Sequence, residues 1–120
     1  MLRDQGCLGH HWEVMSGGIP EFDWKVFREL HPVWLERYWQ RVNSELARRL
    51  SDQRLSAHKR YLAVYSLIDR KDRELGQAFN DMRRSTGVVQ IRIIRALGVI
   101  TDNELARFSD STRNFIDAEF

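Results

Sequence analysis

The stretch LSAHKRYLAVYSLIDRKDRELGQAFNDM, residues 55–82, decides the fold of this 120-residue chain. Its apolar side chains recur at helical spacing, and no Pro or Gly interrupts the polar run 69–74. The apolar positions are Leu55, Leu62, Tyr65, Ile68, Leu75, Phe79 and Met82. We therefore predict one helix over about 52–84, capped by Ser51 or Ser56 and about 50 Å long. A break near 69–72 is the alternative, because Asp72 falls on the apolar stripe.

The two prolines, Pro20 and Pro32, divide the preceding sequence. Asp23 is a good N-cap, and Phe22 with Phe27 makes a hydrophobic staple, so a first helix is expected over about 23–30. Pro32 disfavours helical geometry in the residue before it and suits the first position of a helix. A second helix is therefore predicted over about 32–50.

Two more helices are predicted after residue 84. Residues 86–97 are apolar on most sides, which predicts a buried helix that begins at Ser85 or Thr86 and ends at Gly98. The run Thr101-Asp102-Asn103-Glu104 fits a capping box at the start of the last helix, which Ser109–Ser111 would kink.

These patterns predict an all-α fold: a small bundle of four to five helices with short turns and one long central helix. Residues 19–120 would form one helical domain, preceded by a flexible tail over 1–18 in which Met15 is a candidate start. A central helix in one piece would overhang its neighbours, and overhanging apolar residues favour a homodimer.

Several function classes lack support in the sequence. The apolar runs are too short to span a membrane. Cys7 is the only cysteine, so no intramolecular disulfide is expected, and a cytoplasmic location fits. No nucleotide-binding glycine motif or catalytic spacing is present, so we expect neither an enzyme nor a cofactor. Cys7, His10 and His11 supply too few ligands to predict a metal site.

The charge is divided along the chain. Residues 37–95 hold 14 Lys/Arg against 6 Asp/Glu, whereas residues 1–36 hold 3 against 6 and residues 96–120 hold 2 against 5. A basic middle between acidic ends can pair within the fold or bind an acidic partner. The sequence leaves both alternatives open.

The first functional hypothesis is a non-enzymatic interaction or regulatory protein that docks a protein partner or a second copy of itself. A cluster of aromatic residues near the first helices would supply the apolar anchors, and nearby arginines the charged rim. The predicted partner-binding residues are Trp34, Tyr38, Trp39, Arg48, Arg49 and Arg54. Trp34 and Trp39 lie about 140° apart on a helix, so they are not expected to face the same way.

The second hypothesis is a nucleic-acid-binding regulator with a helix-turn-helix-like basic surface. The predicted contacts are Arg83, Arg84, Gln90, Arg92 and Arg95. The helix over 86–97 would read the bases, although its apolar composition leaves few side chains for that task. Neither hypothesis includes a small-molecule substrate.

Overall fold

The structure is a computed structural model that describes residues 18–118. The expectations about Cys7, His10, His11 and Met15 lie outside the described residues. The flexible tail predicted over 1–18 lies outside them too, apart from Gly18, which is buried.

Within residues 18–118 the chain forms five helices and no strand, which confirms the all-α prediction. The helices are α2 (Glu21–Leu50), α3 (Ala57–Phe79), α4 (Gly87–Ala96), α5 (Asp102–Leu105) and α6 (Asp110–Asp117).

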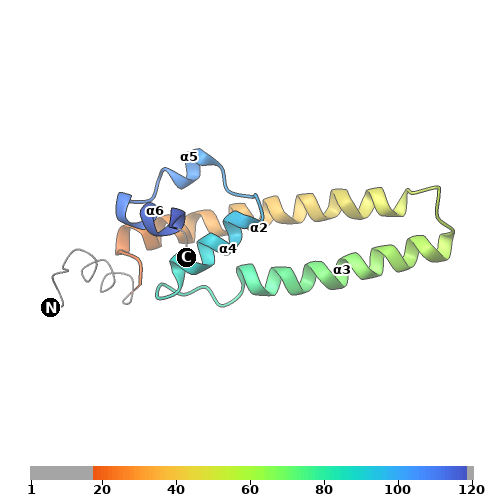
Figure 1. Ribbon diagram of the computed structural model, residues 1–120, viewed down its shortest axis with the longest axis horizontal. Coiled ribbons are helices and arrows are strands. Elements are labelled where there is room, and N and C mark those ends of the chain that lie inside the picture. Colours follow the sequence, from red (N-terminus) through yellow and green to blue (C-terminus); the bar gives the residue numbers. More distant parts are fainter. Residues whose placement is uncertain (1–17, 119–120) are drawn as a thin grey trace.

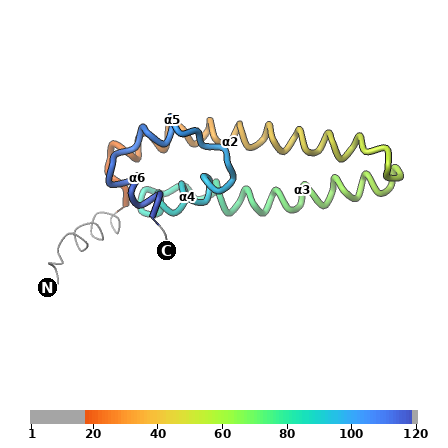
Figure 2. Tube along the Cα trace, turned by 45° about the horizontal axis from the view of Figure 1, so that its top comes forward, coloured from red at the N-terminus to blue at the C-terminus, as the bar shows by residue number. Residues whose placement is uncertain are grey.

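An antiparallel hairpin of α2 and α3 sets the shape of the molecule, which measures 65 × 25 × 21 Å. Figures 1 and 2 show the two helices side by side, with α4, α5 and α6 gathered near the start of α2. We call these three helices the C-terminal cluster. The far half of the hairpin, residues 43–70, extends beyond the cluster, and we call it the arm.

The helix break predicted at Pro32 is wrong, because α2 runs through this residue without interruption. A proline inside a helix removes one hydrogen bond and crowds the preceding turn, at a cost of about 3 kcal/mol. Phe27, Leu30 and Trp34 are all buried around it. Burying side chains of this size stabilises by about 1.5–3 kcal/mol each, which outweighs the cost of the proline.

Asp23 was predicted to cap the first helix, and the structure gives it a different role. The helix begins two residues earlier, after Pro20, and Phe22 is 62% exposed, so no staple forms. The buried Asp23 carboxylate accepts hydrogen bonds from the Ser109 N–H (2.7 Å), the Ser109 hydroxyl (2.6 Å) and the Thr112 hydroxyl (2.6 Å). It thereby fixes the start of α6 to the start of α2.

The central helix is shorter than the predicted 52–84, and α2 rather than α3 is the longest helix. Ser56 caps α3, because its hydroxyl accepts a hydrogen bond from the Lys59 N–H at 3.2 Å. The helix ends at Phe79, and Asp81 after it has a positive φ of 59°. The alternative of a break near 69–72 is also wrong, since α3 is continuous there.

The C-terminal cluster follows the local sequence signals closely. Gly98 has a φ of 77°, the left-handed geometry that ends α4 as predicted. The capping box at Thr101 and Glu104 is present and opens α5. Ser109 caps α6, so the expected kink is a full division into two helices.

The core lies between the first half of α2, the end of α3 and the cluster. Trp34 and Phe27 are its largest fully buried side chains. Its other members include Leu30, Tyr38, Val42, Phe79, Ile91, Ile94, Val99, Phe108 and Ile116. The arm therefore receives little of the apolar burial that holds the rest of the chain together.

Replacing Pro32 by Ala is expected to raise the free energy of unfolding by about 1–2 kcal/mol. Pro32 is exposed, so alanine restores a backbone donor without leaving a cavity. Urea denaturation measures the effect, with V33A as the control, since exposed Val33 already has its backbone N–H. Lower stability of P32A would instead mean that the core needs the backbone shape that proline imposes.

Candidate functional site

The buried rows of the hairpin divide its surface into two sides. The row of α2 that faces α3 consists of residues 38, 42, 45 and 49. The facing row of α3 consists of residues 60, 64, 67, 71 and 74, and every residue of both rows is buried or half-buried. In an antiparallel helix pair, positions 39 and 46 of α2 share one side with 61 and 68 of α3. Positions 41 and 48 share the opposite side with 63 and 70.

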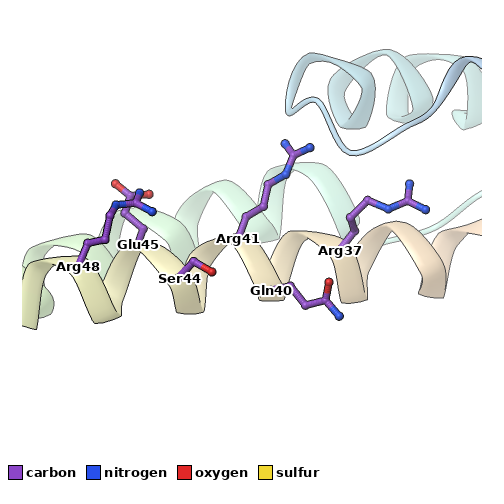
Figure 3. Close-up of a pocket in the computed structure, with 6 residues that line it drawn as sticks. All are labelled: Arg37, Gln40, Arg41, Ser44, Glu45 and Arg48. Atoms are coloured by element: carbon purple, nitrogen blue, oxygen red, sulfur yellow. The ribbon is translucent and has the colours of Figure 1, made fainter.

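The side with positions 41, 48, 63 and 70, which we call the basic side, carries a hollow of about 470 Å³ along α2, drawn in Figure 3. Its lining residues are Arg37, Gln40, Arg41, Ser44, Glu45 and Arg48. Figure 3 shows Arg37 and Arg41 pointing to the segment after α4, whereas Gln40 points away. Arg41 donates to the carbonyls of Leu97 (3.1 Å) and Gly98, and Arg37 to that of Val99. These cations therefore close the C-terminus of α4.

Glu104 is the acceptor that joins α5 to α2. Its carboxylate receives two hydrogen bonds from Arg37, at 2.9 and 3.0 Å, and one from the Trp34 indole N–H at 3.0 Å. It also receives the Thr101 N–H at 2.9 Å. The hydrogen bonds from Arg37 lower the pKa of Glu104 to about 2, helped by those from Thr101 and Trp34.

The predicted aromatic patch is not at the surface. Trp34 is fully buried and Tyr38 nearly so, while Trp39 is half-buried. The Tyr38 hydroxyl donates to the Lys71 carbonyl (2.9 Å) and to Glu74 (3.1 Å), and burial followed by Glu74 raises the pKa of Tyr38. Placing Trp34 and Tyr38 on a docking surface was wrong, because packing of the C-terminal cluster and α3 covers them.

The three arginines of the predicted rim differ in their surroundings. Arg48 is exposed and makes no hydrogen bond or ion pair within residues 18–118. Arg49 pairs with Glu45 at 3.2 Å, the i, i+4 pair expected on a helix. Arg54, whose side chain is 88% exposed, pairs with Asp52 at 2.9 Å and lowers the pKa of that carboxyl to about 2. The structure does not gather the three with the predicted aromatics.

The side chains of the nucleic-acid hypothesis have acceptors within the fold. Gln90 is buried and donates to two backbone carbonyls, those of Ala78 and Asn80, each at 3.1 Å. Arg92 donates to carbonyls at the end of α6, and Arg95 pairs with Asp117. Arg84 contacts the Ile19 carbonyl (2.7 Å) and Glu21 (3.2 Å), and Arg83 contacts Asp81 (2.9 Å). The acidic ends therefore partly neutralise the basic middle.

The side of the arm opposite the hollow is apolar. The sequence predicted that overhanging apolar residues of the central helix favour a homodimer, but named none of these side chains as binding residues. We call this side of the arm the apolar side, defined by the exposed residues Leu50, Tyr61, Leu62, Tyr65 and Ile68. Tyr61 and Tyr65 are each 63% exposed, although both lie on a long helix. A sequence signal for this apolar side was available. Residues 61, 65 and 68 repeat at helical spacing, one position beyond the row that faces α2.

Other types of site find no support in residues 18–118. No group of His, Cys, Asp or Glu there is arranged to hold a metal ion. The helices in this part of the chain also lack the length and apolar character needed to cross a bilayer.

Replacing Glu104 by Gln is expected to lower the free energy of unfolding by about 2 kcal/mol at pH 7. Because the folded pKa of Glu104 lies below its usual 4.5, its contribution is complete above pH 4.5 and disappears as the pH falls toward 2. Denaturation should therefore show a large difference in the free energy of unfolding between wild type and E104Q at pH 7, but not at pH 2. E36Q, at an exposed acid, serves as the control; an equal difference at both pH values would refute the role of the carboxylate charge.

Comparison of the chain with known protein families, curated proteins and solved structures finds no match. The function proposed below therefore rests on the exposed side chains of the arm.

Proposed function

We propose that the protein is a non-enzymatic interaction or regulatory protein that docks a helical protein segment on the apolar side of its arm. The observation that carries this proposal is the exposure of Tyr61 and Tyr65 together with Leu50, Leu62 and Ile68. These five side chains present roughly 500 Å² to solvent, comparable to the largest apolar patch of a typical monomer. Patches of this size on soluble proteins commonly bind partners.

The composition of the apolar side suits docking. Tyrosine offers a large rigid surface with a polar tip, so it tolerates water in the free protein and gains contact area on binding. The arm's cations Arg48, Lys59 and Arg70 lie on its other side, so docking on the apolar side would depend on apolar burial rather than on these charges.

Nucleic-acid binding remains the alternative, with weaker support. The arginines first assigned to it contact carbonyls or carboxylates of the same chain. The remaining exposed cations of the arm, Arg48, Lys59 and Arg70, lie on the side away from the tyrosines, so base stacking on an aromatic surface is not supported.

Affinity capture from the native cell extract with a tagged protein tests the proposal. The Tyr65→Asp variant places a charge in the middle of the apolar side, whereas Ser44→Asp places the same charge at an exposed position on the opposite side of the arm. The docking proposal expects a protein bound by wild type and S44D but lost with Y65D. The purified captured protein should bind with at least about a 100-fold weaker affinity to Y65D.

Two outcomes contradict this proposal. Capture that disappears after nuclease treatment, and that survives in Y65D, supports the nucleic-acid alternative. Equal capture by wild type and Y65D, resistant to nuclease, excludes the apolar side as the docking surface. Circular dichroism of Y65D ensures that any loss of binding occurs in a folded protein.

A further inference from the structure

The apolar side of α3 has the pattern of a second helix–helix seam. Its first seam, at positions 60, 64, 67, 71, 74 and 78, packs against α2. Positions 61, 65, 68, 72, 75 and 79 repeat the same spacing of four and three residues about 100° further around the helix. A helix with two such seams has two helical neighbours in a bundle, yet within residues 18–118 only α2 lies beside α3 in the arm.

The second seam is covered at one end and open at the other. Phe79 is buried against the His31 and Tyr38 rings of α2, and Leu75 is half-buried beside the core. Tyr61, Tyr65 and Ile68 are exposed in the arm. The missing neighbour therefore belongs beside the arm, and the period of the seam identifies it as a helix.

We propose that this neighbour is α3 of a second copy of the chain, packed antiparallel across a two-fold axis that passes between Tyr65 and Ile68. The proposal rests on the docking role of the apolar side and names its occupant. Under this symmetry Tyr65 of each copy faces the partner's Ile68, and Tyr61 faces the partner's Asp72. Both contacts occur twice because the axis exchanges the two chains.

Asp72 is the observation that favours a second copy over another helix. It is an exposed carboxylate on an otherwise apolar seam, and it makes no hydrogen bond or ion pair within residues 18–118. The Tyr61 hydroxyl likewise makes no hydrogen bond there. The antiparallel arrangement brings the phenol donor to the carboxylate acceptor, so two polar groups at opposite ends of the open seam satisfy each other.

The size and charge of the surface agree with this occupant. Each copy offers roughly 500 Å² from the five exposed apolar residues, and the half-buried Trp39 and Leu46 on the same side add to it. A standard interface needs about 800 Å² from each partner, so a dimer of moderate, micromolar affinity is expected. The cations Arg48, Lys59 and Arg70 lie on the other side, so the two copies do not bring them face to face.

A lipid surface suits this side less well. Asp69 and Asp72 border the tyrosines, and the arm's unpaired cations point the other way. A helix that lies on a membrane carries its cations beside its apolar face, where they reach anionic lipids. The C-terminal cluster does not block a second arm, because Arg37 and Arg41 join it to the basic side.

Sedimentation velocity across the micromolar range tests the inference with full-length protein. Wild type and S44D should pass from monomer to dimer as concentration rises, whereas Y65D should raise the dimer dissociation constant about 100-fold. Y61F and D72N should each weaken the dimer about 3- to 10-fold, and the double variant no more than either alone. Additive effects of Y61F and D72N would refute the contact between them.

A distance measurement tests the orientation. A spin label on cysteine at position 58, in the C7S background, should give a label-to-label distance of about 25 Å or more in the antiparallel dimer. A distance near 10 Å would mean parallel arms and would overturn the proposed axis.

The two proposals fail differently. Wild type that stays monomeric at every concentration overturns the second copy as occupant, while Tyr65-dependent capture of another protein preserves the docking function. Dimerisation that Y65D leaves unchanged overturns the assigned surface. Binding to vesicles that contain anionic lipid tests the remaining alternative. If the wild type is monomeric without vesicles and binds to them, and Y65D does not bind, the apolar side would be assigned to a membrane instead.

Discussion

The Glu104 carboxylate is the contact on which the assembly of the C-terminal half depends. It accepts hydrogen bonds from its own helix start, from the Trp34 indole and from the Arg37 guanidinium. Charge-assisted bonds of this kind are roughly twice as strong as neutral ones, and the indole partner is itself fully buried. One side chain thereby fixes where α5 lies on α2 and accepts a hydrogen bond from the buried indole N–H of Trp34.

Besides forming ion pairs, arginine side chains of this fold donate hydrogen bonds to the free carbonyls at the ends of helices and turns. Arg41 does so for α4, Arg92 for α6, and Arg60 for the turn before α3. A guanidinium group offers five donors in a rigid plane, so one side chain satisfies several carbonyls that a helix leaves without partners. The excess of cations in the middle of the chain is therefore partly structural, which a count of charges does not reveal.

The sequence predicts the helices better than it predicts their surroundings. The capping box at Thr101 and the left-handed Gly98 are local signals, and both are present. Pro32 was misjudged because its cost is local, whereas the burial of Phe27 and Trp34 that outweighs it is tertiary. Asp23 was misjudged for the same reason, since its partners on α6 are more than eighty residues away. The candidate surface was not assigned to particular residues because Tyr61 and Tyr65 look like core residues in the sequence, whereas no helix within residues 18–118 covers them.

The projection of the arm beyond the core makes the stability of this molecule uneven. Among the residues that the structure describes, each helix of the arm has one helical neighbour, and Leu67 is the arm's only fully buried apolar side chain. The arm should therefore open locally without unfolding the C-terminal cluster, and its amide protons should exchange with solvent sooner than those around Trp34. Whatever covers the tyrosines would then also slow this opening, so that protection of the amides at the hairpin tip becomes a direct signal of occupancy.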